Sequence, residues 1–93
     1  MSDPIGKQPR HWVNDHDALQ KFGNDMYLKL RENSHKAHWN TVSNDWLFAR
    51  LMDEVHELNE VMDEDPEKII RECADVANFA MMIADNARNH ELG

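Results

Sequence analysis

Four acidic residues stand in two pairs along this chain of 93 residues. Glu54 and Glu57 lie three positions apart, and so do Glu72 and Asp75. On a helix, a step of three places two side chains on neighbouring parts of one face. Two such pairs on facing helices would gather carboxylate oxygens, and this costs free energy unless a hard cation such as Mg²⁺ neutralises them. The spacing therefore predicts a metal site of the kind that binds phosphates.

The rest of the sequence predicts a small all-α domain that would position these acids. Residues 1–13 contain Pro4, Gly6 and Pro9, and we expect them to form an irregular arm. Residues 14–93 are expected to form a single domain. A domain of this size buries a limited fraction of its surface, and a single cysteine supplies no disulfide. We therefore expect three helices per chain that pair through a dimer into a helical bundle.

Apolar residues that recur at steps of three and four predict the helices. The first is expected over residues 14–31 and the second over residues 45–62. The third is expected over residues 66–89, because an aspartate followed by a proline suits the start of a helix. The polar stretch 32–44 between the first two is expected to be a loop, and loops of this length are often functional.

Two of the four acids have apolar surroundings. Glu54 falls within the predicted apolar stripe of the second helix, and Glu57 lies on the edge of that stripe. Asp75 belongs to a stretch, residues 73–84, that is apolar nearly all round and therefore packs on several sides, which points to a subunit interface. Acids are almost never buried without a partner. The residues of the predicted stripe are Leu47, Leu51, Val55, Leu58 and Met62.

Other interpretations of these acids were weighed. A di-iron site needs Glu-x-x-His on two helices, whereas His56 follows Glu54 by two positions and the third helix has no histidine at the required step. A zinc site built on His35 and His38 stays open, although no third ligand is evident at ordinary spacing. A solvated, charged helix face is the simplest alternative, and it fits Glu57 best.

The four-acid pattern resembles a known family signature. Glu54-x-x-Glu57, a gap of fourteen residues, then Glu72-x-x-Asp75 is similar to the motif of the MazG-like, all-α nucleoside triphosphate pyrophosphatases. An upstream segment, residues 29–39, reads Lys-Leu-x-x-Asn-x-His-Lys-x-x-Trp and resembles one found in small, often phage-encoded members. Motifs of this kind predict a function only in the right structural context.

The resemblance, which extends over roughly residues 22–85, implies hydrolysis of a nucleoside triphosphate, often a deoxynucleotide, to the monophosphate and pyrophosphate. It implies Mg²⁺ held by the four acids, with Mn²⁺ as an alternative metal. Glu54 and Glu57 would be catalytic, and the sequence leaves open whether Glu54 bridges the metal or acts as general base. Members assemble as dimers or dimers of dimers, with the active site near the subunit contact. Where the family often has a tyrosine, this chain has Phe79, which keeps the ring and loses the hydroxyl.

Several other residues are candidates for binding the substrate. Lys36 is our candidate for the phosphate chain, and Arg50 and Lys29 are weaker ones.

Trp39 is a candidate for stacking on the base, with anchoring of the loop as the alternative. His35 and His38 are candidates for hydrogen bonds to base or phosphate. Asn78, one turn after the last acid, is placed to orient a carboxylate or the nucleotide. The alternative for each histidine is a solvent-exposed side chain without a role in binding.

Charge and hydropathy restrict the partners. The net charge of −8 and the lack of a basic stripe argue against a nucleic-acid partner. The sequence has no apolar signal segment and no run long enough to span a bilayer, so we expect a cytoplasmic protein without a membrane partner. Two other classes of function stay open: a helical module that binds metal or nucleotide without turnover, and a structural dimerisation protein whose acids form a charged face.

Overall fold

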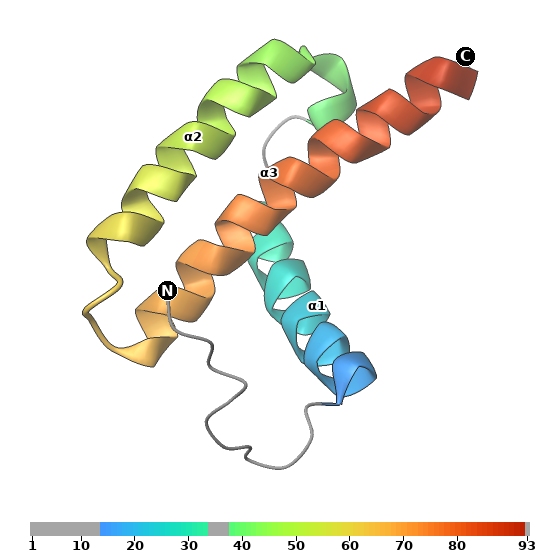
Figure 1. Ribbon diagram of the computed structural model, residues 1–93. Coiled ribbons are helices and arrows are strands. Elements are labelled where there is room, and N and C mark those ends of the chain that lie inside the picture. The colour runs from blue at the N-terminus through green and yellow to red at the C-terminus, as the bar shows by residue number, and fades with distance from the viewer. Residues whose placement is uncertain (1–13, 34–37, 93) are drawn as a thin grey trace.

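The computed structural model describes residues 14–33 and 38–92, and in these residues it contains helices and no strand (Figure 1). The predicted all-α architecture is thereby confirmed. The expected arm, residues 1–13, lies outside the described residues. No helix in the described part of the chain unites the length and the apolar character that crossing a bilayer requires. The elements are α1 (Asp15–Glu32), the short 3₁₀ helix η2 (Trp39–Thr41), α2 (Asn44–Glu60) and α3 (Pro66–Leu92).

Each long helix begins at a side chain that caps it. The side-chain oxygen accepts a hydrogen bond from the backbone N–H three positions later, at 2.9 Å for Asn14, 3.1 Å for Ser43 and 3.1 Å for Asp65. A cap of this kind stabilises a helix by about 1 kcal/mol. These caps explain why the helix starts were predicted to within one residue. The third helix, expected to end near residue 89, continues to residue 92.

Helix α3 is the element that the others share. Helix α2 lies along one side of it and α1 crosses it on another, while η2 contacts its C-terminal half (Figure 1). Among the described residues, Leu47 and Ala74 are the only apolar residues that are fully buried. The single chain therefore has a small core, as expected for a domain of this size.

Helix α2 carries two neighbouring stripes. The inner stripe faces α3 and consists of Leu47, Leu51, Glu54, Leu58 and the following Val61. The outer stripe is apolar and exposed. Val55 and Met62 were expected in the inner stripe and are instead 39% and 54% exposed. Val55 lies about 100° round the helix from the buried Glu54, and Met62 follows the end of the helix. The outer stripe, as named below, consists of Phe48, Met52 and Val55.

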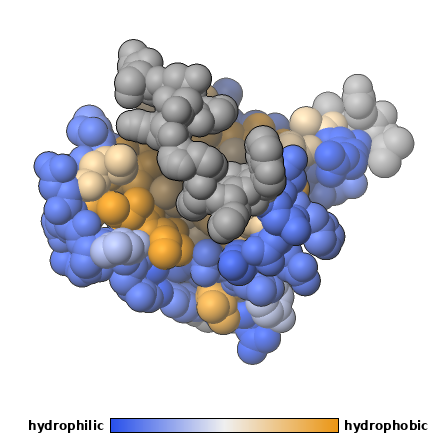
Figure 2. Space-filling model, turned by 60° about the horizontal axis from the view of Figure 1, so that its bottom comes forward, coloured by the Kyte–Doolittle hydropathy of each residue, from blue (hydrophilic) through white to orange (hydrophobic). Residues whose placement is uncertain are grey.

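Further large apolar side chains are exposed. Figure 2 shows apolar residues gathered on one face of the molecule, surrounded by polar ones. Exposed apolar patches of this kind often mark sites of interaction. Besides the outer stripe, the exposed large apolar residues are Leu19, Tyr27, Leu28, Trp46, Met62 and Ile70.

Candidate metal site

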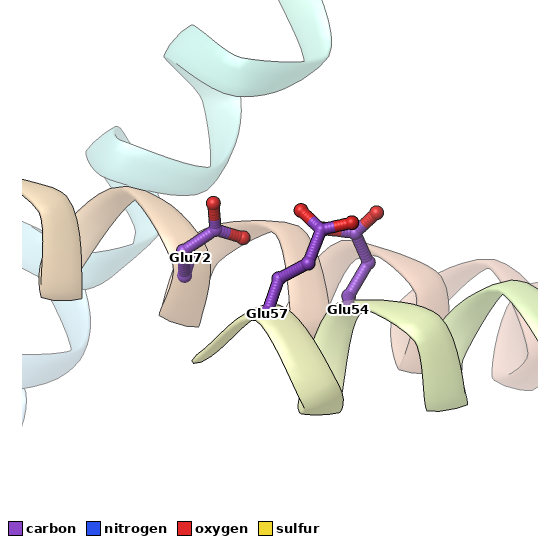
Figure 3. A group of neighbouring side chains, drawn as sticks. All are labelled: Glu54, Glu57 and Glu72. Carbon is purple, nitrogen blue, oxygen red and sulfur yellow. The ribbon is translucent and has the colours of Figure 1, made fainter. Parts of the chain in front are cut away.

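Three of the four predicted acids converge in space. Glu54 and Glu57 project from α2, and Glu72 projects from α3 toward them (Figure 3). One carboxylate oxygen from each of the three lies within 4.8 Å of the others. The packing of α2 against α3 produces this convergence, because it brings the inner stripe of α2 to the face of α3 that carries Glu72. These three residues are called the glutamate cluster below.

The three glutamates differ in burial. Glu54 is 6% exposed, Glu57 is exposed, and Glu72 is half-buried. Oε1 of Glu72 is buried and has no hydrogen-bond partner within the described residues. Arg50 lies 3.2 Å from Oε2 of Glu54 and 2.9 Å from Oδ2 of Asp53, so a single guanidinium is shared between two acids. The cluster therefore runs from a buried end to an exposed rim and is only partly neutralised.

The electrostatics of Glu54 reflect this position. Burial is the main cause that raises the pKa of Glu54 from 4.5 to about 7, and the charges of Glu57, Asp75 and Glu72 raise it further. The charge of Arg50 acts in the opposite direction. The metal-free carboxyl of Glu54 therefore keeps its proton to a much higher pH than an ordinary glutamate does. A bound cation would take over the neutralising role of that proton.

Glu72 shows the same tendency. Burial raises the pKa of Glu72, and repulsion from Asp75 and Glu57 adds to this effect. A hydrogen bond with Glu54 and the positive charge of Lys29 lower it. Two carboxyl groups that lie this close can share one proton. The cluster is therefore an acid site that gains from either a proton or a cation.

The fourth acid faces a different partner. Oδ2 of Asp75 lies 3.4 Å from the ammonium nitrogen of Lys29 on α1, and the two side chains are 20% and 14% exposed. Asp75 is therefore half-buried, in agreement with the apolar stretch in which it lies. Asp75 is not a member of the glutamate cluster, although its negative charge raises the pKa of Glu54 and of Glu72. From the sequence, Lys29 was expected only as a weaker candidate for the phosphate chain, and its contact with an acid was not predicted.

A second ion pair fastens α1 to α3 close to Lys29. Arg71 donates two hydrogen bonds to the carboxylate of Glu32, at 2.9 and 3.1 Å. Lys29 lies 3.4 Å from the same carboxylate. This pair was not predicted from the sequence, because no local pattern relates two charges that are 39 positions apart.

Phe79 lies beside the buried end of the cluster. The guanidinium carbon of Arg50 is 5.3 Å from the centre of the Phe79 ring, within the range of a cation–π contact. Because Arg50 also contacts Glu54, the ring supports the cation that neutralises the deepest acid. The ring of Phe79 therefore packs next to the site, and this packing does not need the hydroxyl of a tyrosine.

Asn78 fastens α1 rather than contacting an acid. Asn78 is only 4% exposed, and its Nδ2 donates a hydrogen bond of 3.0 Å to the backbone oxygen of Met26. Its Oδ1 is buried and lacks a hydrogen-bond partner in the part of the chain that the structure describes. The amide therefore helps to dock α1 on α3.

Trp39 contacts the C-terminal half of α3, away from the glutamate cluster. Its indole N–H donates to Oδ2 of Asp85 at 3.0 Å, and its backbone oxygen accepts from Asn86 at 3.1 Å. Asp85 is ten positions, or about 15 Å, beyond Asp75 along the helix. These contacts support the anchoring interpretation, and within one chain Trp39 is not brought to the glutamate cluster. The exposed His38 lies edge-on to the Trp39 ring, with centroids 6.4 Å apart.

Two of the substrate-binding candidates, His35 and Lys36, lie outside the described residues. Arg50 and Lys29 are described, and both contact acids of the site. The glutamate cluster offers carboxylate oxygens, which are the ligands that Mg²⁺ prefers.

In comparisons with known proteins, no family model matched the chain, and neither a curated protein nor a solved structure was significantly similar to it.

Proposed function

We propose that this protein hydrolyses nucleoside triphosphates, deoxynucleotides in particular, to the monophosphate and pyrophosphate in a Mg²⁺-dependent reaction. One observation carries the proposal: two helices bring three glutamates together with oxygens within 4.8 Å, and one of these residues is 6% exposed. The step from an acid cluster to triphosphate cleavage rests on the resemblance of the four-acid pattern to MazG-like pyrophosphatases.

The residues present fit a divalent cation. Glu54, Glu57 and Glu72 would hold it, with Asp75 as the fourth acid nearby. The buried Oε1 of Glu72 has no hydrogen-bond partner in residues 14–33 and 38–92, and a cation would satisfy this atom. Bound Mg²⁺ would supply positive charge to phosphate oxygens and lower the pKa of a coordinated water.

Glu54 is our choice for the general base. It is the most buried of the three glutamates, so its carboxylate is held deep in the cluster, next to the cation and the water that the cation would bind. In the proposed reaction, the oxygen of a water forms a bond to the α-phosphorus, and the bond to the bridging oxygen breaks. Pyrophosphate leaves, and Glu54 accepts the proton of the water. Glu57, which is exposed at the rim, lies where a substrate can reach it.

We further propose that a second copy of the chain covers the outer stripe of α2. Phe48, Met52 and Val55 are 55%, 49% and 39% exposed. Because about half of each side chain is already buried, covering the rest contributes roughly 1 kcal/mol for each residue. The stripe belongs to the helix that carries Glu54 and Glu57, so such a dimer would place the metal site next to the subunit contact.

The activity is tested with the purified protein and a panel of ribo- and deoxynucleoside triphosphates in the presence of Mg²⁺. We expect equal amounts of monophosphate and pyrophosphate, and no product in excess chelator. A well-folded oligomer that turns over no member of the panel, with Mg²⁺ or Mn²⁺, would overturn the proposal. The oligomeric state is read from sedimentation of the wild type and of Phe48→Glu, which should be monomeric.

The alternatives predict different combinations of results. A module that binds metal without turnover would show an increase in melting temperature with Mg²⁺ and no product, because a ligand that binds the folded state stabilises it. A structural dimerisation protein would show neither effect. The enzyme should show both.

A further inference from the structure

A lysine of α1 is held between two acids. The ammonium nitrogen of Lys29 lies 3.4 Å from Oδ2 of Asp75 and 3.4 Å from Oε1 of Glu32. Its side chain is only 14% exposed, and lysines are rarely buried to this degree without a partner. Both separations exceed the roughly 2.7–2.9 Å of a strong charge-assisted hydrogen bond. The ammonium is therefore shared between the two carboxylates and held tightly by neither.

Glu32 does not depend on this lysine. Arg71 donates two hydrogen bonds to it, at 2.9 and 3.1 Å, and such a bidentate pair is the strong form of this interaction. The hydrogen bond from Arg71 is also the main cause that lowers the pKa of Glu32. Lys29 can consequently move away from Glu32 without leaving that carboxylate uncompensated.

Asp75 depends on Lys29 much more. Among the described residues, Lys29 is the one cation within ion-pair distance of Asp75. Burial is the largest cause of the raised pKa of Glu54 and of Glu72, and the charge of Asp75 raises both further. Lys29 thus neutralises the acid that adds to the repulsion in the glutamate cluster while remaining outside it. A divalent cation in the cluster and the ammonium of Lys29 would each reduce the repulsion between Asp75 and the glutamates.

We propose that Lys29 is a built-in counter-ion of the metal site, which neutralises Asp75 when no divalent cation is bound and turns to a phosphate oxygen of the substrate when one is. The inference rests on the proposed function. The geometry assigns Lys29 two effects of opposite direction: it weakens the binding of a metal on its own, and it strengthens the binding of a polyphosphate to the metal-loaded protein.

The test is calorimetric titration of the full chain with Mn²⁺ alone, followed by titration of the metal-loaded protein with inorganic tripolyphosphate. In Lys29→Met, Mn²⁺ should bind about two- to fivefold more tightly and tripolyphosphate about two- to fivefold more weakly, which is the scale of a partly exposed ion pair. Lys29→Arg should restore both affinities. Lys68→Met removes the same charge from an exposed pair with Glu64 and should change neither affinity.

A loss of Mn²⁺ affinity in Lys29→Met, or no change relative to Lys68→Met, would overturn this inference. An unchanged affinity for tripolyphosphate would overturn it as well. If the wild type binds no Mn²⁺, the metal site of the proposed function is refuted. That outcome differs from equal Mn²⁺ binding by the wild type and Lys29→Met, which would refute only the role of Lys29. Should Lys29→Met lose its helical circular dichroism, Lys29→Gln takes its place, because it keeps most of the stem and removes the charge.

Discussion

The two acid pairs obtain their compensating cations in different ways. Glu54 is paired with Arg50 of its own helix, four positions earlier. Asp75 is paired with Lys29, which belongs to another helix and reaches it only because α1 docks on α3. The pair on α2 is therefore organised within one helix, whereas the pair on α3 depends on tertiary packing. One half of the site should therefore persist when α1 is loosened, and the other half should not.

Loss of activity should separate the two acid pairs most strongly. Glu54→Gln keeps the shape of the side chain and removes the base, so kcat should fall by a factor of about 10² or more, the scale of general acid–base catalysis. Asp75→Asn should cost less, because Asp75 lies outside the glutamate cluster. Steady-state assays of both variants measure the difference, with Glu60→Gln, an exposed acid of the same helix, as control. Equal losses for the two variants would remove the proposed distinction.

The second effect is a pH dependence of stability in the metal-free protein. The folded-state pKa of Glu54 is about 7 and its ordinary value is 4.5, so between these values the folded state binds more protons than the unfolded state. The free energy of unfolding should therefore fall as pH rises through this window, by about 1 to 3 kcal/mol, and stay lower above it.

Urea denaturation in chelator at fixed protein concentration, at pH 5 and pH 8, measures this change. In Glu54→Gln the buried side chain no longer titrates, so the decrease should be much smaller, although Glu57, Glu72 and Asp75 still repel one another. The same decrease in wild type and variant would show that Glu54 is not its source.

A third prediction concerns the docking of α1. Asn78→Ala removes the hydrogen bond to the backbone of Met26 and should destabilise the protein by about 1 kcal/mol. Amide hydrogen exchange should rise in α1 and stay nearly unchanged in α2. A uniform increase over all helices would contradict the view that α1 is the separately docked element.

The smallest effect is expected at the exposed pair between α1 and α3. Arg71→Ala breaks the bidentate contact with Glu32, yet both side chains are nearly half exposed, so the loss of stability should be small. The loss should shrink in high salt. Thermal denaturation at two salt concentrations measures it, and a larger, salt-independent loss would mean that the pair contributes through packing rather than through charge.

The starts of the helices could be predicted from the sequence because local signals specify them. Asn14, Ser43 and Asp65 are caps whose partners lie three positions away. The burial of Glu54 was predictable from its apolar surroundings. The outward position of Val55 was not, because the apolar residues of α2 form two adjacent stripes and their pattern alone does not say which one faces α3.

Contacts between distant segments could not be predicted in the same way. Asn78 bonds to a residue 52 positions away, and Trp39 to one 46 positions away. Both side chains had been considered for the nucleotide, and in this structure both hold helices or turns in place. No periodicity or spacing relates such residues, since their proximity arises only when α1 and η2 have packed against α3.

The separation of these contacts along the chain also bears on the order of folding. Helices α2 and α3 are joined by a short turn, whereas the contacts that hold α1 on α3 close loops of 39 and 52 positions. Contacts between nearby segments generally form sooner. The glutamate cluster should therefore assemble in a hairpin of α2 and α3 before Lys29 arrives, so that for a short time its charges repel without their counter-ion. A divalent cation present at that stage would be expected to accelerate folding as well as to stabilise its product.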